Sequence, residues 1–401
     1  MCEGDLWLAL TTNEYMYTTY IGALQYKRRM EITDISETNI DSTRTLASIQ
    51  IIDNIEKHTG ADSLELATIL GWQIITRIGE AIVGTKVIYC EIDSMLPVDA
   101  PWLPLAIKDR IVKEQTKDFF RVKTIKLRGE LSQGLIIPIV DTLPSHEYDS
   151  MEVGTNVTNF LGIKKYEPPA LTGKFAMYAT NSGSRFPTHL IDKTDEPRVQ
   201  SNPKLFTLLQ EKPYYITVKL DGTSVTYLIN PDTQELMVCS RNLVRKRPDN
   251  LSVCPYWYIA AKYNIEEKLK QNPHLAVQGE ICGPNIQRNL LGLKDLDLFV
   301  FNVVDIRNRS FMGWNNMVDI CKNILGLSHV PLEEIGDSFS CENIKAILTK
   351  AQGTYEKTKN PREGLVIRSA NGGIQRIPLG IQQSYISFKA INNDYLLKYG
   401  C

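Results

Sequence analysis

A lysine stands inside an apolar, β-branched stretch of this chain, in the segment YYITVKLDGTSVTYLI (214–229). Lys219, Asp221 and Gly222 form a Lys-x-Asp-Gly pattern within it. Because burial disfavours an ammonium group, a lysine in such a stretch is expected to have a lowered pKa. The neutral amine could then attack phosphorus. The pattern is short enough to occur by chance, so it needs support from the rest of the sequence.

Further charged residues stand at the ends of apolar, strand-like segments. They are Arg241 after ELMVCS, Glu280 in AVQGEICGPNIQRN, Glu363 before GLVIRS and Lys389 in SFKA. Carboxylates can hold a divalent metal directly or through its waters, and cations neutralise the charge of a phosphoryl transition state. On one continuous strand, Lys219 and Asp221 would point to the same face, and Gly222 would let a ligand approach.

Each of these residues alone has an ordinary structural explanation. A single carboxylate at a strand end is more often a turn residue than a metal ligand, and a single lysine or arginine is most often solvated. The complete set, in this order and at strand ends, favours phosphorus chemistry.

The order of these residues resembles the covalent nucleotidyltransferase superfamily, which includes ATP-dependent DNA and RNA ligases and mRNA-capping guanylyltransferases. The resemblance implies that Lys219 is the catalytic nucleophile, which forms a covalent lysyl–nucleotide bond. It also implies that Lys389 of the last motif acts in catalysis and in cofactor binding, on the α-phosphate. The other cofactor-binding residues would be Asp221, Gly222, Arg241, Glu280, Phe299 and Glu363, and the metal ligands would be Asp221, Glu280 and Glu363.

Two positions in this resemblance are open. Phe299 matches the motif whose aromatic ring stacks on the purine, with Phe301 as the alternative, and core packing explains Phe299 nearly as well. Ser387 stands where the last motif often has the first of two lysines. Another residue such as Lys398, or a metal ion, would then have to fill that role.

The elements that position these residues fall into two regions. Between Thr45 and about residue 140, short strand patterns separated by turns indicate a small β-barrel. The polar segment 141–195 is predicted to have little regular structure. Beyond Arg198, strands alternate with helices. The expected elements there are a hairpin around 230–232, helices over 257–271 and 341–353, and strands around LAVQGEICG, DLFVFNVVDI, GLVIRSA and SYISFKAI.

The barrel region resembles the OB module of an RNA ligase family in which this module precedes the catalytic domain. GEICGPNIQRN resembles the RNA ligases that seal nicked duplexes. We therefore predict an α+β chain with an N-terminal extension (1–43), an OB-fold β-barrel domain (44–167) and a nucleotidyltransferase (adenylation) domain of antiparallel sheets flanked by helices (168–401). Only twelve residues follow Lys389, too few for the C-terminal OB barrel of DNA ligases and capping enzymes.

The composition narrows the class of protein. Of the 401 residues, 43% are hydrophobic and 23% charged, as in soluble globular proteins, and the net charge is −1. The sequence contains no apolar run of bilayer length and no secretory signal. The eight cysteines are scattered without a Cys-x-x-Cys pair, which indicates reduced thiols in an intracellular protein without structural zinc. Cytoplasm and nucleus are not distinguished.

With so little net charge, nucleic-acid binding must come from local patches. The basic segment 117–128 includes Lys123, Lys126 and Arg128, and OB barrels use such strands to follow a phosphate backbone. A second basic cluster contains Arg245, close in sequence to Arg241, although a solvated loop explains its neighbours 246 and 247 as well.

The functional hypothesis is an ATP-dependent RNA ligase that seals nicks with 3′-hydroxyl and 5′-phosphate ends in RNA repair. It would act through lysyl–AMP and an adenylylated 5′ end, with ATP as the AMP donor and Mg²⁺ or Mn²⁺. The expected partner is RNA, in a nicked duplex or in an RNA/DNA hybrid; no membrane is involved, and a monomer is expected. Two alternatives stay open: a capping-type guanylyltransferase, and an OB-type binding module with a vestigial nucleotide site.

Overall fold

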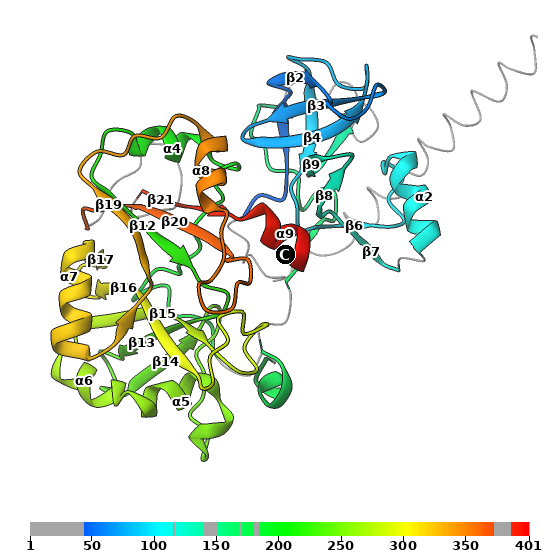
Figure 1. Ribbon diagram of the computed structural model, residues 1–401. Coiled ribbons are helices and arrows are strands. Elements are labelled where there is room, and N and C mark those ends of the chain that lie inside the picture. Colours follow the sequence, from blue (N-terminus) through cyan, green and yellow to red (C-terminus); the bar gives the residue numbers. More distant parts are fainter. Residues whose placement is uncertain are drawn as a thin grey trace, which may run out of the picture. The chain divides into compact units, whose positions relative to one another are not determined.

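The computed structural model describes residues 44–114, 117–139, 151–167, 171–179, 184–372 and 386–400. The predicted N-terminal extension therefore lies outside the described residues. The chain divides into two compact units, Met1–Glu167 and Pro168–Cys401 (Figure 1). In the part of the chain that is described, no helix is long and apolar enough to span a bilayer.

The first unit consists of short antiparallel strands. They pair in the orders β1-β5-β10, β2-β3-β4, β11-β6-β7 and β8-β9. A buried core of large side chains, including Trp72, Ile88 and Tyr89, fills the space between them. The strands are β1 (Ala47–Ile51), β2 (Asn54–Lys57), β3 (Leu64–Ile69), β4 (Trp72–Arg77), β5 (Lys86–Cys90), β6 (Ser94–Pro97), β7 (Phe119–Arg121), β8 (Thr124–Leu127), β9 (Glu130–Gln133), β10 (Leu135–Pro138) and β11 (Lys164–Lys165).

Among the described residues of the first unit, Leu105–Glu114 form a helix, α2, which the sequence pattern did not predict. Leu105 and Val112 on it are largely exposed, so its apolar residues do not form the single stripe that marks a helix in a sequence. The strands before and after this helix, β6 and β7, were predicted from the turn residues that bound them.

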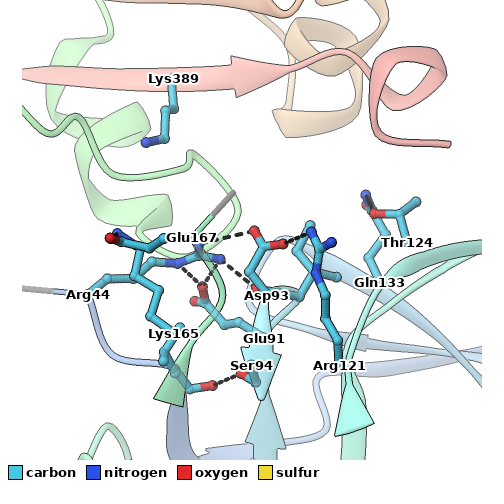
Figure 2. A network of polar contacts seen from close by, with 12 residues as sticks. Arg44, Glu91, Asp93, Ser94, Arg121, Thr124, Gln133, Lys165, Glu167 and Lys389 are labelled. Atoms are coloured by element: carbon cyan, nitrogen blue, oxygen red, sulfur yellow. Dashed lines mark hydrogen bonds and ion pairs between the residues drawn. The ribbon is translucent and has the colours of Figure 1, made fainter. Parts of the chain in front are cut away.

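A network of ion pairs joins Arg44, the first described residue, and Arg121 on β7 to the acidic residues that follow β5 (Figure 2). Arg44 donates to Glu91 at 3.0 Å, and Arg121 donates to Asp93 at 2.7 Å. The guanidinium of Arg121 also lies 3.4 Å from the centre of the Tyr166 ring. Arg121 belongs to the basic segment 117–128, but its guanidinium forms an ion pair with Asp93 within the first unit.

The described part of the second unit contains two sheets, which are antiparallel except where β18 runs parallel to β16. The four-stranded sheet has the order β19-β12-β20-β21, and the larger sheet the order β14-β13-β15-β16-β17 with β18 paired to β16. The strands are β12 (Tyr214–Lys219), β13 (Thr223–Ile229), β14 (Leu236–Ser240), β15 (Leu275–Cys282), β16 (Asp297–Asp305), β17 (Ser310–Phe311), β18 (Ser328–His329), β19 (Leu332–Gly336), β20 (Gly364–Ser369) and β21 (Ser387–Ile391).

Helices cover each sheet and give it a separate core (Figure 1). One core joins residues of α4 and α8 to the four-stranded sheet, and another joins α5, α6 and α7 to the larger sheet. The helices are α4 (Pro203–Leu209), α5 (Pro255–Lys262), α6 (Ile265–Gln271), α7 (Trp314–Asp319), α8 (Ile344–Ala351) and α9 (Asn393–Tyr399). Helical segments of 3₁₀ or π type are η2 (Gly173–Ala179), η3 (Leu251–Val253) and η4 (Ile320–Leu325).

Two predicted elements are broken in the structure. The helix expected over 257–271 is two helices, because Asn264 between α5 and α6 has φ 49° in the left-handed region. The single strand expected through VKLDGTSVTYLI is also wrong. It ends at Lys219 and resumes at Thr223 in the other sheet, so Asp221 lies in the connection between the sheets.

Candidate active site

Lys219 is the last residue of β12 and pairs with the carboxylate of the residue that directly precedes the neighbouring strand, β20. In the antiparallel register, Lys219 lies opposite Gly364, directly after Glu363. The Nζ atom of Lys219 lies 2.9 Å from both carboxylate oxygens of Glu363. Both side chains are partly buried. Strand pairing therefore joins two predicted site residues that are 144 positions apart in the sequence.

Gly222 sets the approach of this segment to β15, which carries Glu280. A Cβ atom on Gly222 would lie 2.4 Å from the carbonyl oxygen of Ile281 and 2.7 Å from Cγ of Glu280. Any other residue would force the two segments apart. The glycine of the Lys-x-Asp-Gly pattern is thus required by this close packing, and it brings Glu280 toward Lys219.

Lys389 on β21 shares a sheet face with Lys219. Thr217, Val366 and Lys389 form one row across the sheet, and Lys219 stands two residues from Thr217 on the same strand. Because side chains alternate along a strand, both lysines project from one face. Nζ of Lys389 lies 3.2 Å from Oδ1 of Asp195, and Arg241, just after β14, pairs with the same carboxylate.

The pKa of Lys219 is raised, and the expectation of a lowered pKa is wrong for this arrangement. Burial alone would lower the pKa, but the carboxylates of Glu363 and Glu280 favour the ammonium form and outweigh it. Lys219 is therefore protonated here, as the ion-pair partner of Glu363. The sequence pattern showed the apolar strand around the lysine but not the two acids beside it.

The two other carboxyl groups have raised pKa values. Burial raises the pKa of Asp221 above its ordinary range, the negative charge of Glu363 adds to this, and a hydrogen bond from Tyr395 opposes it. Burial also raises the pKa of Glu280, and Glu363 and Asp221 add to it while Lys219 opposes it. Such a cluster of buried, mutually repelling carboxyl groups is typical of a site that receives a cation.

The geometry fits a metal held partly through water. Oδ2 of Asp221 is buried and has no hydrogen-bond partner, which is costly unless an ion or a water engages it. Within the described ranges, no three His, Cys, Asp or Glu side chains lie close enough together to hold one ion directly. Metal ligation by Asp221, Glu280 and Glu363 therefore stays a prediction, with water between ion and carboxylates for part of the set.

The pKa of Lys389 is lowered to about 8. Burial is the main cause, and the positive charges of Lys219, Arg198 and Arg241 add to it, against the opposing effect of Asp195. Arg198 lies beside Lys389 through a parallel bridge, in which Lys389 donates its amide hydrogen to Pro197 and accepts one from Val199. Several cations thus gather on this face, as a polyphosphate would require.

The two phenylalanines on β16 lie in different surroundings. Phe299 is opposite Glu280 in the strand register, so it shares the sheet face on which Glu280 lies. Phe301 lies under the guanidinium of Arg368, 5.7 Å from ring centre to Cζ. Both rings are partly buried beside Leu220. Because Phe299 lies opposite Glu280, it is the better candidate for stacking on the purine, and this role stays a prediction.

The four side chains predicted to contact nucleic acid differ in how exposed they are. Lys123, Lys126 and Arg128 are exposed, on and beside β8 of the first unit. Arg245 is only partly exposed: its Nε donates to Ser240 Oγ at 3.0 Å, and its guanidinium lies over the Tyr256 ring. The first three are therefore the better placed to meet a phosphate backbone.

The structure adds residues that the sequence analysis missed, namely Asp195, Arg198, Tyr355 and Tyr395. Tyr355 donates to the carbonyl oxygen of Lys219 at 3.2 Å. Asp195 lies in the polar stretch that was predicted as a connection, and nothing in its sequence surroundings marks it. Only the folded arrangement places its carboxylate between Lys389 and Arg241.

Ser387 is fully buried on β21, on the same face as Lys389 two residues later. Lys398, proposed as a substitute for the missing lysine, is exposed on α9, and its ammonium group lies over the Tyr399 ring. Arg198, in the segment bridged to Lys389, is one of the cations that lower the pKa of Lys389.

Comparisons with known proteins place the chain in a family. The RNA ligase family profile matches residues 212–390, and an OB-fold domain profile matches residues 46–139. A structure of Naegleria gruberi RNA ligase with PPi has a TM-score of 0.74 and 30% identity, covering 89% of this chain and 99% of that chain. An apo structure of an aspartate-to-alanine variant has a TM-score of 0.74 and 31% identity, covering 90% and 99%.

A lysine-to-alanine variant of the Naegleria gruberi ligase, with ATP and Mn, gives a TM-score of 0.73 at 30% identity over 89% of this chain and 98% of that chain. No curated protein gives a significant sequence match. The comparisons confirm the predicted fold class, an N-terminal OB-fold domain followed by a sheet-rich domain with helices. The chain belongs to the RNA ligase family of enzymes.

Proposed function

We propose that the protein is an ATP-dependent ligase that seals 3′-hydroxyl and 5′-phosphate ends of RNA through a lysyl–AMP intermediate. The observation that carries the proposal is the arrangement of Lys219. It projects from the same sheet face as Lys389 and is bound to Glu363, with Glu280 and Asp221 close enough to interact electrostatically. One nucleophile, several acids and several cations on one face suit transfer of a nucleotidyl group.

In the first step, Nζ of Lys219 attacks the α-phosphorus of ATP. The N–P bond forms, the bond from phosphorus to the bridging oxygen breaks, and pyrophosphate leaves. Lys219 must lose a proton for this attack, and Glu363 is the carboxylate in contact with it. Lys389 and the neighbouring cations stabilise the negative charge on the phosphates.

Two further displacements complete the reaction. The 5′-phosphate of the RNA attacks the AMP phosphorus, which frees Lys219 and leaves an adenylylated end. The 3′-hydroxyl then attacks that end, the phosphodiester forms, and AMP leaves. Each displacement has a good leaving group, which is why a covalent intermediate replaces one difficult condensation by three easier steps.

Asp221, Glu280 and Glu363 are the residues that would hold Mg²⁺ or Mn²⁺. When bound, the metal would offset the negative charge by which these carboxylates keep Lys219 protonated. It would also neutralise charge on the phosphates. The solved Naegleria gruberi ligase with ATP and Mn supports this choice of nucleotide and metal. The unpartnered, buried Oδ2 of Asp221 supports it from this chain's own structure.

RNA is the proposed substrate, as a nicked duplex or as an RNA strand in an RNA/DNA hybrid. The family match supports RNA, and the exposed Lys123, Lys126 and Arg128 of the first unit suit contact with phosphates at any sequence. The sealing of nicks rests on the motif around Glu280.

A sealing assay tests the proposal. The protein with Mn²⁺ and ATP is given a duplex that has one nick with a 3′-hydroxyl and a 5′-phosphate, either as RNA or as DNA. We expect sealing of the RNA nick with ATP and none with GTP alone. Sealing of the DNA nick alone, or transfer of GMP to a diphosphate end, would contradict the proposal.

A further inference from the structure

The C-terminal helix α9 lies next to the candidate active site, although no motif points to it. It follows β21 directly, and Asn392 caps it by accepting the amide hydrogen of Asp394 on Oδ1 at 2.9 Å. Asn392 itself is completely buried. A buried cap fixes both the start of the helix and its direction.

Asn392 also holds the helix to the chain segment that carries Glu363. Its backbone amide donates to the carbonyl oxygen of Glu363 at 2.9 Å. Its side-chain Nδ2 donates to the carbonyl oxygens of Arg362 at 3.0 Å and Gly353 at 3.2 Å. The helix therefore starts from a rigid junction beside the partner of Lys219.

From this junction, the first turn of α9 brings Tyr395 to Asp221, another carboxylate of the candidate site. Tyr395 is 3% exposed, and its hydroxyl forms a hydrogen bond with Asp221. The Tyr395 ring packs edge-on against Tyr399, with centroids 5.1 Å apart. Arg288 donates to the carbonyl oxygen of Tyr399 at 3.2 Å, and its positive charge also acts on Asp221.

We propose that Tyr395 is a positioning residue for the divalent-metal site: its hydroxyl engages one oxygen of Asp221 and thereby directs the other, Oδ2, toward the cation. The unpartnered Oδ2 is the independent observation that points to a ligand there. Second partners of metal-binding carboxylates fix the carboxylate's orientation in this way. The inference rests on the proposed function, because that function supplies the need for the metal.

The test replaces Tyr395 by phenylalanine, which keeps the ring and removes only the hydroxyl. The matched control is Tyr214→Phe, at the other end of β12, because the Tyr214 hydroxyl also donates to a carboxylate, that of Glu334 at the sheet edge. Binding of Mn²⁺ alone is measured from the free-ion signal in electron paramagnetic resonance. The rate of lysyl–AMP formation is measured in parallel as a function of Mn²⁺ concentration.

We expect Tyr395→Phe to weaken Mn²⁺ binding about tenfold or more, and to raise the half-saturating Mn²⁺ concentration similarly. The thermal midpoint should stay close to that of the wild type, and Tyr214→Phe should change neither metal measurement. Unchanged Mn²⁺ affinity in Tyr395→Phe would overturn the inference. Absence of any adduct in the wild-type protein would instead contradict the proposed function, and the Mn²⁺ titration would still decide the role of Tyr395.

Discussion

At the scale of single residues, the proposed chemistry depends on how burial and neighbouring charges shift the pKa values of two lysines. Glu363 and Glu280 keep Lys219 protonated, whereas burial and nearby cations hold the pKa of Lys389 at about 8. The proposed nucleophile, Lys219, is thus held in an ion pair with Glu363, and Lys389, the proposed phosphate-binding lysine, is close to losing its charge. The pKa shifts of the two lysines are opposite because the acids beside Lys219 outweigh its burial, whereas at Lys389 burial together with nearby cations outweighs the carboxylate of Asp195.

Replacing Lys219 separates the first step from the later ones. Lys219→Arg keeps a cation for Glu363 but cannot act as a nucleophile, because the guanidinium does not lose its proton. We expect lysyl–AMP formation to fall by about 10³-fold or more in Lys219→Arg and Lys219→Ala. Both variants should still seal a strand that carries a pre-adenylylated 5′ end. An equal loss in both assays would contradict the assigned role.

The charge of Lys389 predicts a pH dependence. As the pH rises through about 8, Lys389 becomes neutral, so kcat/KM for lysyl–AMP formation should fall on the alkaline side. Lys389→Arg should move this alkaline limb of the pH profile to higher pH, because arginine keeps its proton. Asp195→Asn should move it to lower pH, since the carboxylate of Asp195 raises the pKa of Lys389. A limb that stays in place in both variants would rule out Lys389 as its origin.

At the scale of elements, two sheets meet at the connection Leu220–Gly222. Lys219 ends a strand of one sheet, Thr223 begins a strand of the other, and Glu280 lies on β15 of the second sheet. Gly222 permits the close approach between the connection and β15. The site therefore depends on this contact as much as on the charged groups.

Gly222→Ala tests that contact. The added methyl group would collide with the carbonyl oxygen of Ile281, and backbone cannot move aside as a flexible side chain can. We expect the free energy of unfolding of the second unit to drop by about 1–3 kcal/mol. Lysyl–AMP formation should drop as well, because Glu280 moves away from Lys219. Urea unfolding and adduct assays measure the two effects, and wild-type values in both would refute this account of Gly222.

The sequence predicted the strands of the site well and their contacts poorly. The apolar runs that contain or adjoin Lys219, Arg241, Glu280 and Glu363 are strands, because period and turn residues are local signals. The break at Leu220–Gly222 was missed, because β-branched residues continue on both sides of it. Asp195 and Tyr395 were missed because they join the site only through tertiary packing.

At the scale of the whole molecule, the chain combines an OB-fold unit with a unit that the RNA ligase family profile matches and that contains the residues of the candidate active site. The OB-fold unit offers exposed basic residues around β8, while its Arg121 is engaged with Asp93. This division predicts that binding of RNA and attack on ATP can be separated by mutation.

Combined replacement of Lys123, Lys126 and Arg128 by alanine tests the separation. We expect weaker binding of nicked RNA, with the salt dependence of log K less steep by about 2–3, and unchanged lysyl–AMP formation. A control with the same change of charge replaces the exposed Lys345, Lys357 and Lys359 of the second unit. Equal effects of both triple variants on RNA binding would remove the special role of the β8 region.

The central claim is that the amine of Lys219 becomes covalently bonded to AMP. The most direct measurement is mass spectrometry of the protein after incubation with ATP and Mn²⁺, followed by mapping of the modified peptide. The account predicts a mass increase of one AMP, carried by the peptide that contains Lys219 and absent in Lys219→Arg. A protein without the adduct, or an adduct on another residue, would contradict it.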